Sequence, residues 1–165
     1  MSIVIRLLFF ASLAVILISC YSFTATTLPA HIKTVQITDV DYRSFDPVIA
    51  NRIKDGLTEL FRINAPAVRI VNDNADSQLS VTLLSYNNRP ETQTSNAAVE
   101  TYRVTMGVSV SFYDNIRKKA IYEAKSVQAI GSYDVQKNES EEIQGQERAI
   151  EKLQEIIVAN ALAKW

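Results

Sequence analysis

The stretch VETYRVTMGVSVSFY, residues 99–113, carries the clearest structural pattern in the chain. Its apolar residues fall on alternate positions and would share one face of an extended strand: Tyr102, Val104, Met106, Val108, Val110 and Phe112. The intervening positions are polar or small and would lie on the opposite face: Arg103, Thr105, Gly107, Ser109 and Ser111. A two-residue period sustained over this length predicts a half-buried antiparallel strand, with one face in the core and one polar face.

Other strands are predicted on both sides of this one. AIYEAKSVQAIGSY (120–133) follows the short connection DNIRKK and is the expected hairpin partner. Three shorter strands, rich in β-branched or alternating apolar residues, are predicted earlier in the chain: residues 31–37, 67–71 and 78–86. The segment NNRPETQTSNAA (87–98) has no period and is predicted to be a loop.

A first amphipathic helix is predicted after the first strand. It begins at Asp46-Pro47, because aspartate is a good helix cap and proline suits the first helical position. It ends near Asn64 and Pro66. Its apolar stripe would face the sheet and consists of Ile49, Ile53, Leu57, Leu60 and Phe61.

A second amphipathic helix is predicted to close the chain at Trp165. Asn138 and Glu141 have the spacing of a capping box at its start. Its predicted apolar stripe consists of Ile143, Ile150, Leu153, Ile157 and Ala161. Gly145 lies near the start and should cost about 1 kcal/mol relative to alanine, so we expect the first turn to be weak.

The predicted order of elements is therefore β-α-β-β-β-β-α. Two amphipathic helices and one sheet with a single apolar face indicate an α+β fold. We expect a two-layer sandwich in which both helices pack on one face of a mainly antiparallel sheet.

The N-terminus has the layout of a secretory signal. Arg6 precedes the apolar run LLFFASLAVILIS (7–19), which is too short for a membrane span of about 20 residues. Leu17-Ile18-Ser19-Cys20 resembles the lipobox of bacterial lipoproteins, which implies cleavage before Cys20 and lipidation of its sulfur. The alternative is an ordinary small buried cysteine, and no disulfide can form within the chain because Cys20 is its single cysteine.

These features divide the chain into three parts. Residues 1–19 are a predicted lipoprotein signal peptide, residues 20–31 a lipidated tether, and residues 32–165 a single α+β domain. Loss of Arg6 with the signal peptide changes the formal net charge from −1 to about −2. This balance gives no overall attraction to nucleic acid, so any anion must be bound by a local patch.

No arrangement of residues indicates catalysis, a metal site or a cofactor. His31 is the single histidine and falls in the predicted tether, where we expect it to face solvent. NDNAD (72–76) lacks the glycine and the distal glutamate of a calcium loop and is better explained as a turn. The sequence therefore predicts a protein that is not an enzyme.

Two basic features are candidates for binding an anion. Arg117, Lys118 and Lys119 lie at the tip of the predicted hairpin, and Arg103 projects from the polar face of the long strand. Clustered guanidinium and ammonium groups suit phosphate. The alternative is a solvated hairpin tip and an arginine that lies along the sheet surface.

Several residues together resemble the LptE family of lipopolysaccharide-assembly lipoproteins, in the form found in Bacteroidetes and related bacteria. The mature N-terminus CYSF (20–23) and the following LPAHIKTVQI are similar to the family pattern, as is the closing ANALAKW. Further matches in spacing are Tyr86, Pro90, Ala97-Ala98, Arg103, Thr105, Val108, Val110, Phe112 and Tyr133-Asp134. The resemblance extends over essentially the whole mature chain.

The resemblance implies a location, a partner and a role. Such lipoproteins are anchored by palmitate-type acyl chains, here on Cys20, in the inner leaflet of the outer membrane. They insert into the lumen of the β-barrel protein LptD, assist its assembly and help to move lipopolysaccharide to the cell surface. The candidate contacts with lipopolysaccharide or the partner are Arg103, Arg117, Lys118 and Lys119.

A second hypothesis is a lipid-anchored periplasmic carrier that holds a lipid between the sheet and the helices. The same α+β pattern is compatible with it. An open apolar cleft between the layers would favour the carrier, whereas a closed core would not.

Overall fold

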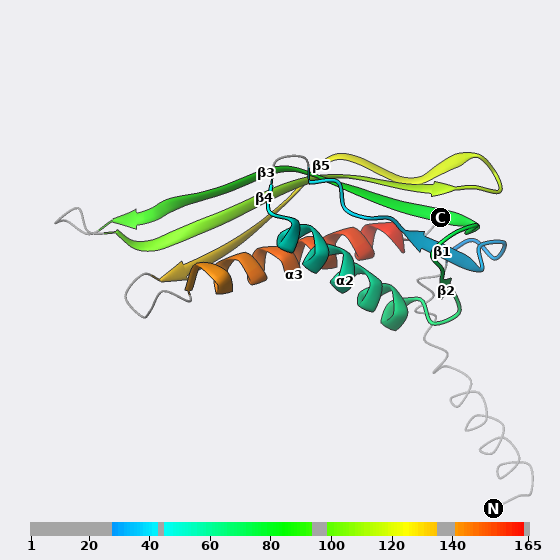
Figure 1. The fold of residues 1–165 in the computed structure, drawn as a ribbon, viewed down its shortest axis with the longest axis horizontal. Helices are drawn as coiled ribbons and strands as arrows, with labels where there is room; N and C mark the ends of the chain where they lie inside the picture. The colour runs from blue at the N-terminus through cyan, green and yellow to red at the C-terminus, as the bar shows by residue number, and fades with distance from the viewer. Residues whose placement is uncertain (1–27, 43–44, 94–98, 135–140, 164–165) are drawn as a thin grey trace, which may run out of the picture.

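The computed structural model describes residues 28–42, 45–93, 99–134 and 141–163 (Figure 1). The predictions for the signal peptide, for Cys20 and for the tether up to residue 27 lie outside these residues. The same holds for the proposed cap at Asn138 and for the terminal Trp165.

The described residues form five strands and two helices in the predicted order. The elements are β1 (Thr34–Ile37), α2 (Pro47–Asn64), β2 (Arg69–Ile70), β3 (Ser77–Gln93), β4 (Val99–Asp114), β5 (Lys119–Asp134) and α3 (Glu141–Ala161). The sheet order is β2-β1-β3-β4-β5. β1 runs parallel to β2 and β3, whereas the long strands β3, β4 and β5 pair antiparallel.

Both helices lie on one face of this mixed, mostly antiparallel sheet (Figure 1). The α+β two-layer prediction is therefore confirmed. We call the face covered by the helices the inner face and the opposite face the outer face.

The alternating pattern of β4 builds the core as predicted. Val104, Met106, Val108 and Phe112 have no exposed surface, and Val110 is also buried. Phe112 meets Phe61 of α2 edge to face, with ring centroids 5.9 Å apart. Edge-to-face contact is a favoured arrangement of aromatic rings, so it fixes how α2 lies on the sheet.

The predicted start of the first helix is confirmed. Asp46 is the N-cap, and its side chain accepts a hydrogen bond of 2.8 Å from the backbone N–H of Val48. Pro47 is the first helical residue. Ile49, Ile53, Leu57 and Phe61 are buried, while Leu60 is partly buried against the core.

The prediction of a loop over residues 87–98 is wrong for its first half, because β3 continues to Gln93. A register shift between Leu83 and Ser85 breaks the two-residue alternation that would have revealed the strand. The pairing continues beyond it, with Asn87 opposite Thr105. Hydrogen bonding to β4 therefore maintains a strand whose side-chain pattern is irregular. The strand predicted at 67–71 is shorter than expected, only Arg69–Ile70.

The predicted stripe of the closing helix is correct except at its start. Ile150, Leu153, Ile157 and Ala161 are buried, but Ile143 is 50% exposed. The buried face of the helix contains Glu141 and then Gly145, which lies against the ring of Tyr133. Gly145 is therefore a packing position, and its cost as a helix residue is offset by this contact.

Gly131 of β5 makes the same close approach from the sheet side. A Cβ atom on Gly131 would lie 1.9 Å from the carbonyl oxygen of Gly145 and 2.7 Å from the backbone nitrogen of Ala149. Both atoms belong to the backbone of α3 and cannot rotate away. Two glycines therefore allow α3 to lie directly on β5.

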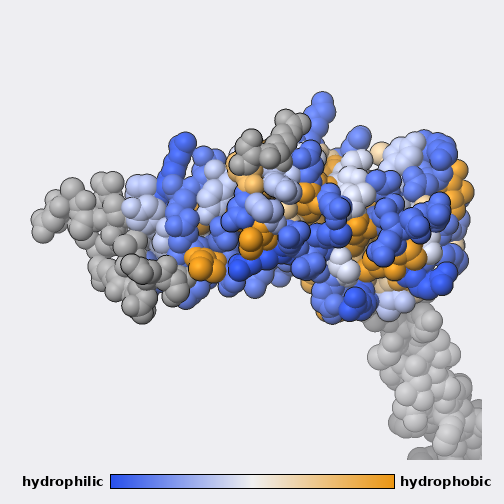
Figure 2. All heavy atoms as spheres, in the orientation of Figure 1, coloured by the Kyte–Doolittle hydropathy of each residue, from blue (hydrophilic) through white to orange (hydrophobic). Residues whose placement is uncertain are grey.

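The face of the domain shown in Figure 2 is predominantly hydrophilic. Figure 2 shows apolar surface in this view only as small areas scattered among hydrophilic ones. Among the described residues, no helix is both long and apolar enough to cross a membrane.

Substituting Gly131→Ala should destabilise the domain by about 3 kcal/mol, because the added methyl group overlaps the backbone of α3. Gly107→Ala is the matched control, since there the new Cβ would meet first the hydroxyl of Ser85, which can rotate. Urea denaturation of both variants measures the difference. Equal free energies of unfolding would show that α3 and β5 are not in close contact.

Candidate functional site

The outer face is a polar sheet surface without a helix over it in the described part of the chain (Figure 1). The strand register places hydroxyl groups side by side on this face, with Ser80 opposite Ser111 and Thr82 opposite Ser109. These side chains are partly exposed. Hydroxyl groups can donate and accept hydrogen bonds, so the outer face can bind a polar partner through direct or water-mediated contacts.

Arg103 lies on the outer face, as predicted, but its charge is already paired. Its guanidinium donates to the carboxylate of Glu91, and the other carboxylate oxygen accepts a bond of 3.0 Å from the Ser132 hydroxyl. Arg89 lies opposite Arg103 in the register, and both line a shallow hollow with Glu91. The two arginines and one glutamate leave this hollow with an excess of one positive charge.

The other basic candidates lie at the opposite end of β4. Arg117 and Lys118 belong to the connection between β4 and β5, and Lys119 is the first residue of β5. All three are exposed. Since β4 runs from Arg103 to Asp114 at about 3.3 Å per residue, about 35 Å separates the two sets. The structure therefore does not bring the four predicted basic residues together.

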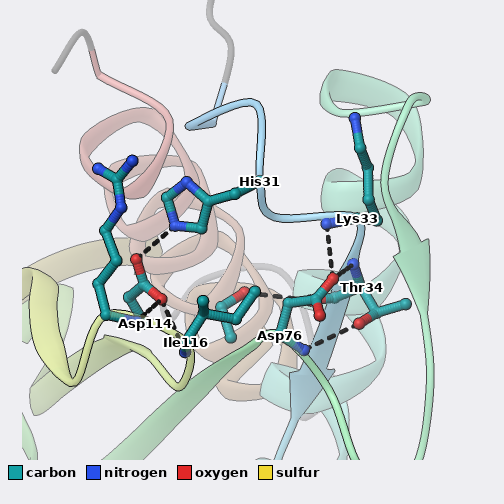
Figure 3. A network of polar contacts seen from close by, with 8 residues as sticks. His31, Lys33, Thr34, Asp76, Asp114 and Ile116 are labelled. Atoms are coloured by element: carbon teal, nitrogen blue, oxygen red, sulfur yellow. Dashed lines mark hydrogen bonds and ion pairs between the residues drawn. The ribbon is translucent and has the colours of Figure 1, made fainter.

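The connection between β4 and β5 is tied to the N-terminal segment by a buried carboxylate (Figure 3). Oδ2 of Asp114 lies 2.6 Å from Nε2 of His31, and Oδ1 accepts the backbone N–H groups of Ile116 and Arg117. The side chain of Asp114 is 1% exposed and that of His31 is 21% exposed. The prediction that His31 faces solvent is therefore wrong, because a partner distant in sequence holds it.

A second carboxylate extends this network. Oδ2 of Asp76 accepts the backbone N–H groups of Lys33 and Thr34, at 2.8 and 2.9 Å, and Thr34 Oγ1 accepts the N–H of Asp76 (Figure 3). The backbone oxygen of Asp76 also accepts the N–H of Asn115. Asp76 and Asp114 thus join three chain segments at one end of the sheet. The sequence suggests only that both are turn residues.

The surroundings of both carboxylates favour their charged forms. Burial alone would raise the pKa of Asp114, but hydrogen bonds from the Arg117 backbone, His31 and the Ile116 backbone together hold it below its ordinary value of 3.8. The pKa of Asp76 is also lowered, chiefly by the hydrogen bond from the Lys33 backbone. The described residues contain no group of three or more His, Cys, Asp or Glu side chains that could hold a metal ion.

Leu28 and His31 show how the N-terminal segment joins the domain. Leu28 is 8% exposed and belongs to the core cluster. The described part of the predicted tether, residues 28–31, therefore lies against the fold.

A model of the family described as "LptE: Lipopolysaccharide-assembly" matches residues 32–163. The chain belongs to the LptE family. This is a family of non-catalytic lipopolysaccharide-assembly lipoproteins, so the prediction that the chain is not an enzyme is confirmed. None of the curated protein sequences compared with the chain matches it.

Several solved bacterial structures share the fold, and two of those that follow are described as lipoproteins. An uncharacterized lipoprotein B from Nitrosomonas europaea is 15% identical with a TM-score of 0.57, covering 84% of this chain and 89% of that chain. A minor lipoprotein from Acinetobacter baumannii is 16% identical with a TM-score of 0.51, covering 80% and 94%. PelC of Paraburkholderia phytofirmans, a dodecamer, is 13% identical with a TM-score of 0.51, covering 82% and 92%. At these identities the likeness concerns the fold alone.

Substituting Asp114→Asn should destabilise this LptE-family domain by about 2 kcal/mol at pH 7, because a buried charge-assisted network is lost. The folded pKa lies below 3.8, so the contribution is complete above that value and disappears as the pH falls through the folded pKa. Thermal denaturation from pH 7 to pH 2 measures the difference from wild type. Asp55→Asn, on the exposed side of α2, is the control; an unchanged difference at pH 2 would contradict this account.

Proposed function

We propose that this LptE-family chain plugs an LptD-like outer-membrane β-barrel, assists its assembly and takes part in the export of lipopolysaccharide to the cell surface. Family membership over residues 32–163 supports a role in lipopolysaccharide assembly. The observation that carries the proposed partner is the polar outer face, which no helix of the described residues covers and which offers hydroxyl pairs such as Thr82 and Ser109.

The physical fit between this face and a barrel lumen supports the proposal. The lumen of an outer-membrane barrel is polar, so a protein inside it needs no apolar contact surface. The outer face meets this requirement, because the apolar residues of β4 point inward and its hydroxyl residues point outward. Bridging water can complete hydrogen bonds where the two surfaces do not fit closely.

The proposed location follows from lipidation of Cys20. Acyl chains on this residue would hold the protein in the inner leaflet of the outer membrane, with the domain facing the periplasm and the barrel lumen. Burial of acyl chains contributes about 0.8 kcal/mol per CH₂, and more than one chain gives a stable anchor. Assignment to the Bacteroidetes-type subgroup is part of this proposal and rests on the sequence pattern at residues 20–37.

The core argues against the alternative of a lipid carrier. Val104 and Val108 of β4 have no exposed surface, and neither do Leu153 and Ile157 of α3. These side chains belong to one continuous cluster that fills the space between the layers. A lipid could enter only by displacing them.

The four basic residues proposed to contact lipopolysaccharide should not contribute equally to binding. Arg103 already pairs with Glu91, so its contribution should be small. Arg117, Lys118 and Lys119 have no ion-pair partner among the described residues and can accept phosphate groups without first losing a bond.

A tagged chain expressed in its native envelope and extracted in mild detergent should co-purify with a large β-barrel protein. Gel filtration and mass spectrometry identify the partner. The variant Cys20→Ser, which lacks the residue that would be lipidated, is the control, and it should lose the anchor and recover less barrel. Quantitative recovery of the lipidated chain without a barrel protein would refute the proposal that the chain plugs a β-barrel.

Replacing Arg117, Lys118 and Lys119 together by serine should weaken lipopolysaccharide binding about tenfold or more, because three unpaired cations are removed. Arg103→Ser should change it less than threefold, which makes it the internal comparison. Binding is measured by titration with labelled lipopolysaccharide, and circular dichroism checks the fold. Unchanged binding by the triple variant would support the alternative, in which these residues form a solvated hairpin tip that does not bind lipopolysaccharide.

A further inference from the structure

We propose that the connection between β4 and β5 is a second membrane contact, which binds phospholipid headgroups of the leaflet that holds the lipid anchor. We call this segment, residues 115–119, the basic turn. The inference rests on the proposed anchor at Cys20 but requires neither the barrel nor lipopolysaccharide.

The composition of the basic turn suits a membrane surface. Ile116 is 53% exposed and is followed directly by Arg117, Lys118 and Lys119, all exposed. An apolar side chain beside several cations is typical of segments that lie in the interface of an anionic membrane. The apolar residue can enter the headgroup region while the cations contact phosphate.

The basic turn has a fixed conformation. Oδ1 of Asp114 accepts the backbone N–H groups of both Ile116 and Arg117. The Asn115 side chain donates to the carbonyl oxygen of Ala75 at 2.9 Å, and Lys118 has a positive φ of 54°. Because these bonds hold the backbone, the exposed side chains need little ordering when they meet a surface.

The basic turn also lies at the end of the domain where the anchored segment joins it. His31 contacts Asp114, which holds the turn, and Leu28 is buried in the same domain. From Cys20 to Leu28 the chain can span at most about 28 Å. A lipidated Cys20 therefore keeps the basic turn close to the membrane surface.

Charge complementarity favours an anionic surface as the partner. Two acidic side chains, Asp76 and Asp114, lie at this end of the sheet. Their carboxylates accept hydrogen bonds from backbone N–H groups, and Asp114 also contacts His31. They therefore form no ion pair with Arg117, Lys118 or Lys119. Cations next to an anionic leaflet are attracted over about a Debye length, roughly 10 Å at 0.1 M salt.

The test places a fluorescent probe on the turn of the lipidated protein. Cys20 is the single cysteine and would be acylated, so Ile116→Cys gives one free thiol for an NBD label. The labelled protein is reconstituted into vesicles of phosphatidylcholine with or without phosphatidylglycerol, and flotation verifies the anchor. Ile143→Cys, 50% exposed on α3, is the matched control.

We expect the emission of the probe at position 116 to shift to the blue in phosphatidylglycerol vesicles and to return toward the aqueous value in 1 M salt. The probe at position 143 should remain aqueous. Replacing Arg117, Lys118 or Lys119 by serine should lower the ratio of membrane-bound to free turn. We expect a decrease of about fivefold for each cation removed.

Three results would overturn the inference. The emission of the probe at position 116 could keep its aqueous value in all vesicles with which the protein floats. The anchor would then be intact, and the second contact would be excluded. The probe could enter the membrane only after lipopolysaccharide is added, which would assign the turn to that glycolipid. Failure of the lipidated chain to float would remove the anchor and this inference with it.

Discussion

The contact between Gly131 and Gly145 determines how the two layers of this domain meet. It brings the backbone of α3 directly onto β5, at a distance that no side chain at either position would permit. Gly56 plays a related part between the helices, because Gln154 of α3 occupies the space that its side chain would need. The Gln154 amide then donates to the carbonyl oxygen of Arg52, which joins α3 to α2. Both helices are thereby held on the inner face.

Two consequences of this arrangement bear on function. No helix of the described residues covers the outer face, so the hydroxyl residues of β3 and β4 are available to a polar partner. The ends of the long sheet also differ in character. At one end Arg103 pairs with Glu91, next to Arg89. At the other end, around Asp114, three cations without an ion-pair partner among the described residues lie near the N-terminal segment that contains His31.

The sequence predicts well those elements whose local pattern and tertiary role agree. The alternation of β4 and the cap at Asp46 are of this kind, because the local signal and the observed burial or hydrogen bond coincide. The prediction that Ile143 is buried is wrong, and the packing role of Gly145 is not visible in the sequence, because helical periodicity does not reveal that α3 needs a residue without a side chain against Tyr133. The role of His31 was also hidden, since its partner Asp114 is 83 residues away.

The central claim is that the outer face meets the barrel. A photo-crosslinking amino acid at Ser109, on the outer face, tests it most directly when compared with the same residue at Glu155, on the exposed side of α3. Irradiation of intact cells followed by immunoblotting measures the adduct. We expect a barrel-sized adduct from position 109 that is stronger than any from position 155. An adduct from position 155 with none from position 109 would contradict it.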